Sequence, residues 1–134
     1  MHNLLAFSHI LAYSHIEKAE GYFAVRVKYY ITSSGRSPVE EFLNHLSENI
    51  RSDFLDALLL LESGQNLTLP LSRPLFAINR GLHELRLKDR SGTYRVFYFI
   101  KRGDGIYIIH AFVKKTQDLP QKELEIVKKR LRDI

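Results

Sequence analysis

Three apolar segments follow one another in the second half of the chain, with only short polar connections between them. They cover residues 81–88, 93–101 and 106–114 and are rich in β-branched and aromatic residues, which predicts three strands. The connections KDRSGT and KRGDGI contain Ser-Gly and Asp-Gly, which are strong signals for tight hairpin turns. Any fold of this chain must therefore contain an antiparallel meander.

The flanking residues predict a further strand and three helices. Pro38 follows the capping residue Ser37 and precedes Glu40, a combination typical of a helix start, and Gly64 is a typical helix stop. The expected elements are a strand at 22–31, a helix from Pro38, a second helix over about 48–63, and a last helix over about 120–132. The pattern leaves room for a short extra strand near 74–78. The predicted fold class is α+β: an N-terminal strand, a helical hairpin, a mostly antiparallel sheet of three to four strands, and a C-terminal helix.

The length of 134 residues suits one domain, which we place at 22–134. Residues 1–21 have a different character and are expected to form an N-terminal extension with a short amphipathic helix. The chain has no cysteine, which excludes disulfide scaffolds and thiolate metal sites, and we expect neither a metal nor a cofactor. With no apolar run of membrane-spanning length and no basic residue ahead of the first apolar stretch, a cytoplasmic protein without membrane contact is expected.

Charge is distributed unevenly along the chain. Residues 1–72 hold five Lys or Arg against eight Asp or Glu, whereas residues 73–134 hold fifteen against seven, which gives about −3 and +8 for the two parts. A clustered positive field of this kind favours a polyanionic partner, because cations that neutralise phosphates release counterions. A solvated surface rich in lysine is the alternative.

Arg95 stands in the middle of the apolar run GTYRVFYFI and points to the function. Side chains of a strand alternate between the two faces of a sheet. A two-residue turn at Asp104-Gly105 would place Arg95 opposite Lys114, Phe97 opposite Phe112, and Phe99 opposite His110. In the preceding hairpin, Arg95 would lie opposite Arg86 or Lys88, depending on which residues form the turn.

The alternation sorts the meander into two faces. One face is expected to be the core beneath the helical hairpin; it collects Leu85, Leu87, Tyr94, Val96, Tyr98, Ile109, Ala111 and Val113. The other face collects Glu84, Arg86, Lys88, Arg95, Phe97, His110, Phe112 and Lys114. Like charges on neighbouring strands repel one another, so they require an anionic partner. The aromatic rings among them would offer stacking surfaces to unpaired bases.

The sequence resembles the HigB-like branch of the RelE/ParE superfamily of toxins from prokaryotic toxin–antitoxin systems. The likeness runs from Tyr29 to the C-terminus and is carried by SPVEEFL, RPLFAINRGLHELRLKDRSGTYRVFYF and HAFVKKTQDLPQKELEIVKKR. It implies a small α+β domain that acts as an endonuclease on mRNA in the ribosomal A site. A cognate helix-turn-helix antitoxin of the HigA type is the implied partner.

The resemblance also implies roles for individual residues. Arg95 matches the phosphate-binding arginine of the family, Arg86 is the arginine of HELR, and Lys114 and Lys115 are the basic pair of FVKKT. The candidate catalytic residues are Arg95, Arg86, Lys114 and His110, and the candidate RNA-binding residues are Lys88, Lys115, Phe97, Phe112 and Glu84. The choice of general acid and base among Glu84, Lys88, His110 and Lys114 stays open.

The expected chemistry is metal-independent attack of the RNA 2′-hydroxyl on the adjacent phosphorus, with arginines stabilising the charged transition state. Two alternatives belong to other classes: a ParE-like inhibitor of DNA gyrase that cuts no RNA, and an inactive toxin that only binds its partner. Arg95 is expected to point away from the core, so that its substitution would leave folding intact. The competing interpretation is a structural arginine satisfied by Glu84.

Overall fold

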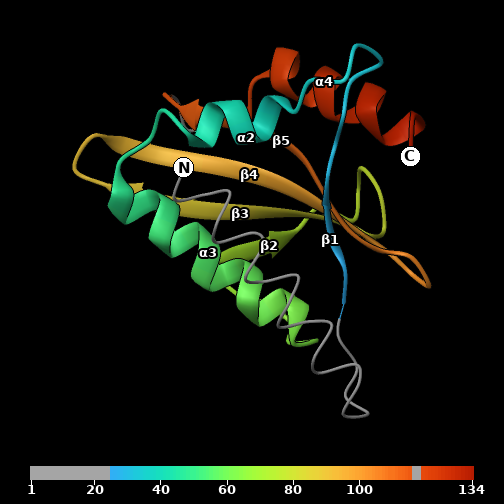
Figure 1. The fold of residues 1–134 in the computed structure, drawn as a ribbon, viewed down its shortest axis with the longest axis horizontal. Helices are drawn as coiled ribbons and strands as arrows, with labels where there is room; N and C mark the ends of the chain where they lie inside the picture. The colour runs from blue at the N-terminus through green and yellow to red at the C-terminus, as the bar shows by residue number, and fades with distance from the viewer. Residues whose placement is uncertain (1–24, 116–118) are drawn as a thin grey trace.

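The computed structural model describes residues 25–115 and 119–134 and shows a sheet with helices on both faces (Figure 1). The predicted extension at 1–21 and the first residues of the predicted strand at 22–31 lie outside the described residues. The elements are β1 (Val27–Tyr29), α2 (Pro38–Leu43), α3 (Glu48–Glu62), β2 (Ser72–Pro74), β3 (Leu82–Asp89), β4 (Gly92–Lys101), β5 (Gly105–Lys114) and α4 (Gln121–Arg132). The α+β class is confirmed.

The sheet is larger than the sequence predicted and its strand order differs. Five strands are ordered β1-β5-β4-β3-β2 in place of the expected three to four, and the sheet is mixed because β1 pairs parallel to β5. The backbone N–H of Ile106 donates to the carbonyl of Arg26 at 2.7 Å. Gly105 allows this approach, since a Cβ atom there would lie only 2.5 Å from the same carbonyl oxygen. The short strand β2 adds to the opposite edge, antiparallel to β3.

A two-residue turn at Arg90-Ser91 joins β3 to β4. Asp89 Oδ1 accepts hydrogen bonds from the backbone N–H groups of Ser91 (2.8 Å) and Gly92 (3.1 Å), which stabilises the turn. The turn places Arg95 opposite Arg86, which confirms one of the two predicted registers.

The connection between β4 and β5 differs from the prediction. Lys101 pairs with Gly105, so the loop has three residues, and a bulge between Phe97 and Tyr98 makes up the difference by adding Ile109 to β5. Beyond the bulge Phe97 pairs with His110, two residues away from the predicted register, so Arg95 lies opposite Phe112 and not Lys114. Ile109 consequently belongs to the face opposite the one predicted for it.

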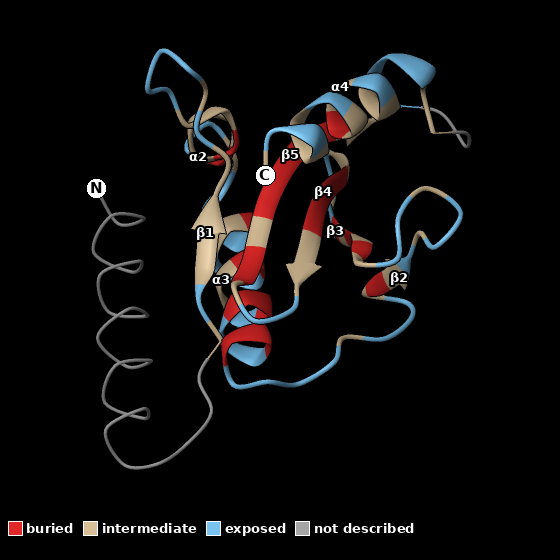
Figure 2. Cartoon of the chain, turned by 90° about the vertical axis from the view of Figure 1, so that its right-hand side faces the viewer, coloured by how far each residue is buried: buried red, intermediate tan, exposed pale blue. Residues whose placement is uncertain are grey.

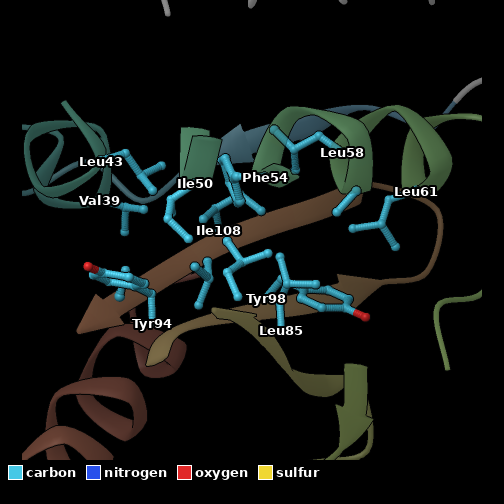
Figure 3. Close-up of a cluster of buried hydrophobic side chains, with 14 of the residues drawn as sticks. Val39, Leu43, Ile50, Phe54, Leu58, Leu61, Leu85, Tyr94, Tyr98 and Ile108 are labelled. Carbon is cyan, nitrogen blue, oxygen red and sulfur yellow. The ribbon is translucent and has the colours of Figure 1, made fainter. Parts of the chain in front are cut away.

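The main core lies between the sheet and the helical hairpin. Figure 3 shows side chains from α2 and α3 meeting those of the strands, among them Leu43, Phe54, Leu58, Leu85, Tyr98 and Ile108. Helix α3 begins and ends close to its predicted limits. Ser47 Oγ accepts from the N–H of Ile50 at its start, and Gly64, the predicted stop, has a φ of +86° just beyond its end. Ser37 does not cap α2 with its side chain; its hydroxyl donates to Glu40 at 2.7 Å.

Helix α4 covers part of the opposite face of the sheet. A second cluster of buried residues forms there, comprising Leu82, Phe97, Ile109, Phe112 and Val127. Figure 2 shows buried segments along β4 and β5, while the outer surface of α4 is exposed. Within residues 25–115 and 119–134, no helix has the length and apolar character needed to cross a membrane.

Candidate functional site

The pairing of the strands places most of the predicted site residues in three rows across the sheet, on the face that α4 partly covers. The row nearest the β3–β4 turn is Lys88, Thr93 and Lys114; the next is Arg86, Arg95 and Phe112; the third is Arg73, Glu84, Phe97 and His110. Neighbouring strands lie about 4.8 Å apart and alternate residues of one strand about 6.6 Å apart. Most of the predicted site residues are therefore brought onto one small area.

An open pocket of about 1040 Å³ lies over this area. We call it the cationic pocket, and it is lined by Pro70, Leu71, Arg73, Arg86, Lys88, Thr93, Arg95, Lys114, Lys115 and Leu119. Six of these ten residues are cationic and none is a carboxylate. Such a concentration of like charge strongly favours an anionic ligand.

A buried carboxylate organises the arginines of the cationic pocket. Glu84 is 0% exposed, and its oxygens lie 2.5 Å from Arg95 Nη1, 3.1 Å from Arg86 Nε and 3.5 Å from Arg73 Nη2. A buried carboxylate is costly unless it is paired and hydrogen-bonded, and the three guanidinium groups supply those partners. Glu84 thus fixes three arginines on adjacent strands and lies beneath the surface of the cationic pocket.

Arg95 is more deeply placed than the sequence suggested. The residue is only 5% exposed, so the expectation that it gains nothing from burial is wrong, and its ion pair with Glu84 gives it a structural role. Strand alternation indicates a face and carries no information on how far a neighbouring element covers it. Arg95 also lines the cationic pocket, and within the described residues its buried Nε has no hydrogen-bond partner. Its guanidinium therefore combines a structural contact with a place at the wall of the pocket.

Lys88 and Lys114 flank Thr93 from either side of β4. The pKa of Lys114 is lowered from its ordinary value by partial burial and then by the positive charge of Arg95. Both causes disfavour the ammonium form, so more of the neutral amine is present near neutral pH than an isolated lysine would show. Lys88 is exposed, and so is Lys115, which directly follows Lys114 in the sequence.

Phe97 and Phe112 do not provide the stacking surfaces that the sequence suggested. Phe97 is 0% and Phe112 8% exposed, and their rings stack on each other with centroids 5.9 Å apart. Both belong to the apolar cluster beneath α4, where Val127 packs. The sequence placed them on the correct face, but the helix covers that part of it.

His110 also lies beneath α4 and does not line the cationic pocket. Its Nε2 lies 3.2 Å from Glu123, and Arg130 donates to its Nδ1 at 3.3 Å, which matches a neutral ring with the proton on Nε2. Burial lowers the pKa of His110, and the nearby charge of Arg130 acts in the same direction, although Glu123 opposes both. These contacts anchor α4 to β5.

Arg73 was missed as a site residue at the sequence level. It lies in β2, a strand of only three residues, and it reaches the site because Arg73 pairs with Glu84 across β2 and β3. The signal available in the sequence was a cation directly before a proline, a residue common at sheet edges. That signal is too general to locate a strand partner.

Two comparisons with known proteins bear on identity. Residues 41–132, more than half of the chain, match the family described as Phage derived protein Gp49-like (DUF891). No curated protein matches the chain. The match spans α3, the whole meander and α4, and so includes every strand of the cationic pocket. The chain therefore belongs to the phage-derived Gp49-like family, a RelE-like toxin family of toxin–antitoxin systems.

Proposed function

We propose that this toxin is a HigB-like mRNA endonuclease that cleaves mRNA in the ribosomal A site and so stops translation. The observation that carries the proposal is the cationic pocket, in which six cations from four strands and the segment after β5 converge without a lining carboxylate. Arg86 and Arg95 lie opposite each other on adjacent strands, held by Glu84. Two arginines fixed in this way suit a phosphate, because each guanidinium can donate two hydrogen bonds to its oxygens.

The proposed reaction uses the RNA's own 2′-hydroxyl as nucleophile. The 2′-oxygen attacks the adjacent phosphorus, the bond from phosphorus to the 5′-oxygen breaks, and the products are a 2′,3′-cyclic phosphate and a 5′-hydroxyl. Negative charge builds on the phosphoryl oxygens in the transition state, where Arg86 and Arg95 stabilise it. Donors fixed in advance at that position contribute the most to such reactions.

Two lysines are best placed for the proton transfers. Lys114, with its lowered pKa, accepts the 2′-hydroxyl proton as the neutral amine, and the exposed Lys88 gives a proton to the leaving 5′-oxygen. They stand on opposite sides of Thr93, roughly two strand spacings or about 9.6 Å apart at their backbones. Glu84 and His110 are engaged in ion pairs and hydrogen bonds away from the pocket surface, so we do not assign them these roles.

An antitoxin is the partner that membership of a toxin–antitoxin family implies. We propose that it is a helix-turn-helix protein of the HigA type that blocks access to the cationic pocket or prevents entry into the ribosome. The charge of the pocket also explains why an antitoxin is needed, because a positive pocket of this size would otherwise attract cellular RNA during growth.

The test is expression in a growing bacterial culture, with mRNA ends mapped by primer extension. Wild-type protein is expected to arrest translation and to produce new mRNA ends within ribosome-bound reading frames. Arg86→Gln is the informative variant, because the Arg86 side chain is 26% exposed and its loss disturbs the fold less than loss of Arg95. Arg132→Gln is the matched control: it makes the same change in net charge at an exposed position on α4.

Arg86→Gln should abolish the new ends while Arg132→Gln retains them. Intact mRNA together with an induced DNA-damage response would overturn the proposal in favour of a ParE-like gyrase inhibitor. Normal growth on expression of folded wild-type protein would instead indicate a toxin that only binds its partner.

A further inference from the structure

A second group of aromatic and basic side chains lies at the opposite end of β3 and β4 from the cationic pocket. Two adjoining cavities of about 440 and 890 Å³ share the residues Asn66, Phe76, His83 and Ile100. We call them together the aromatic cleft. The larger is also lined by Arg80, Lys101 and Arg102, and neither has a lining carboxylate. The cleft is therefore cationic as well as aromatic.

The rings of the aromatic cleft are arranged in steps from the core to the surface. Tyr98 is 1% exposed and its hydroxyl is within 2.6 Å of Ser72 Oγ, so it forms a fixed floor. His83 stacks on Tyr98 with centroids 5.0 Å apart and planes 10° apart. Phe76 meets His83 edge-on at 6.4 Å and is 66% exposed. The outermost ring is thus presented to solvent in front of an ordered stack.

His83 adds a hydrogen-bond acceptor to this arrangement. Its Nδ1 lies 3.1 Å from the carbonyl oxygen of Gly81, so Nδ1 carries the proton and Nε2 of the neutral ring is an acceptor. Burial lowers the pKa of His83, which favours that neutral form. An exocyclic amino group of a base is a matching donor.

From the exposed ring, the stacked histidine and the three cations, we infer that the aromatic cleft binds an unpaired RNA nucleotide, with its base on Phe76 and its phosphates near Arg80 and Arg102. Aromatic rings bordered by basic side chains are the general means by which proteins hold unpaired bases, since every base has a face that can stack. The Phe76 ring is 66% exposed and borders both cavities of the cleft, so its outer side is open to a stacked base.

The RNA in the aromatic cleft differs from the segment that would occupy the cationic pocket. His83 and Leu85 point to the α3 face, whereas Glu84 and Arg86 point to the α4 face. From His83 to Lys88 the strand advances roughly 17 Å. Because the two sites lie at opposite ends of β3 and β4, and His83 is on the face opposite that of Arg86, the cleft fits a second segment of a folded RNA. This inference rests on the proposed function for the nature of the ligand, which is RNA.

The test uses a fluorescein-labelled twelve-residue oligoadenylate with 2′-O-methyl riboses, which cannot be cleaved because the nucleophile is blocked. Its affinity for the full chain is measured by fluorescence anisotropy, so the result does not depend on ribosomes or on activity. Phe76→Ala and Phe76→Leu are expected to bind roughly five- to a hundredfold more weakly, the range for loss of one stacked base. Ile31→Ala, another exposed apolar side chain (52% exposed), is the matched control and should bind like the wild type.

Amide chemical shifts locate the contact and separate it from the cationic pocket. On titration with adenosine 5′-monophosphate, residues 80–83 and 99–102 should shift in the wild type and not in Phe76→Ala. Wild-type affinity of Phe76→Ala would overturn the inference. Wild-type affinity of Phe76→Leu alone would also overturn it, because RNA binding would then not depend on stacking of a base on an aromatic ring. Neither result affects the proposed function, which instead fails if Arg86→Gln still cleaves mRNA.

Discussion

Replacement of Glu84 by glutamine tests whether one buried charge holds the cationic pocket together. Glutamine keeps the size of the side chain and one acceptor oxygen, but it removes the negative charge and adds an N–H₂ group that faces arginines. Glu84 is 0% exposed and contacts three guanidinium groups at 2.5, 3.1 and 3.5 Å. The change leaves Arg95, itself 5% exposed, without its counter-ion.

The size of the effect follows from the burial of the pair. Removing one partner from a buried ion pair costs about 3 to 5 kcal/mol, because the remaining charge stays away from water. Arg73 and Arg86 have side chains 42% and 26% exposed, so they turn to solvent and add little to the loss. For 134 residues, 1 kcal/mol corresponds to a change of about 3 to 4 °C, so the Tm should fall by roughly 10 to 20 °C.

The assay is urea unfolding at neutral pH, followed by circular dichroism. Glu41→Gln is the control: it breaks an arginine–carboxylate pair of the same 2.5 Å length, but one whose side chains are 67% and 45% exposed. Exposed pairs contribute about 0 to 1 kcal/mol, so this variant should remain close to the wild type. If Glu84→Gln is no less stable than Glu41→Gln, the cluster is effectively solvated and the reasoning fails.

Three further predictions concern the pocket and the helix that borders it. Arg95→Ala should slow cleavage on programmed ribosomes roughly 100- to 1000-fold and also lower the Tm, whereas Arg95→Lys should restore more of the Tm than of the rate; a wild-type rate for Arg95→Lys would contradict this. Lys114→Gln should remove the rise of the single-turnover rate with pH that a base with a lowered lysine pKa produces below the ordinary lysine value, and an unchanged pH profile would exclude Lys114 as the base. The pKa of His110 is lowered in the folded state, so the unfolded chain binds more protons and the free energy of unfolding should fall as pH drops below about 6.5. His110→Gln should flatten that fall, and because His83 has a pKa lowered in the same direction, His83→Gln measures its share; a fall as steep as the wild type in both variants would refute the assignment.

Much of the fold was predictable because its signals are local. The meander was recognisable from three apolar segments and two short turns, and α3 and α4 begin and end within about one residue of their predicted limits. The sheet edges were not predictable in the same way. β1 and β2 are three residues each, and they pair with strands far away in sequence, so only the assembled structure determines their place.

The cationic face was predicted by assuming a two-residue turn in each hairpin. The prediction is correct in part because two deviations in the second hairpin cancel each other. The loop between β4 and β5 has three residues and not two. This extra residue alone would place every side chain of β5 on the face opposite to the predicted one. The bulge at Ile109 adds a second extra residue and cancels this effect from His110 onward, so Lys114 still lies on the same face as Arg95. A bulge leaves no clear mark in the sequence, and Ile109 was therefore assigned to the wrong face.

The cationic face has a buried part beneath α4 and an open part that lines the cationic pocket, and the position of α4 determines where one ends and the other begins. Val127 packs on the cluster of Phe97 and Phe112, so the rows nearest α4 became core. Leu119, just before the helix, lines the cationic pocket, so the N-terminal end of α4 lies beside the pocket. The unpaired N–H groups of a helix start carry partial positive charge, which adds to the field of the six cations. The same helix therefore completes the core and increases the attraction of the open part of the face for a polyanion, which a pattern read along single strands cannot reveal.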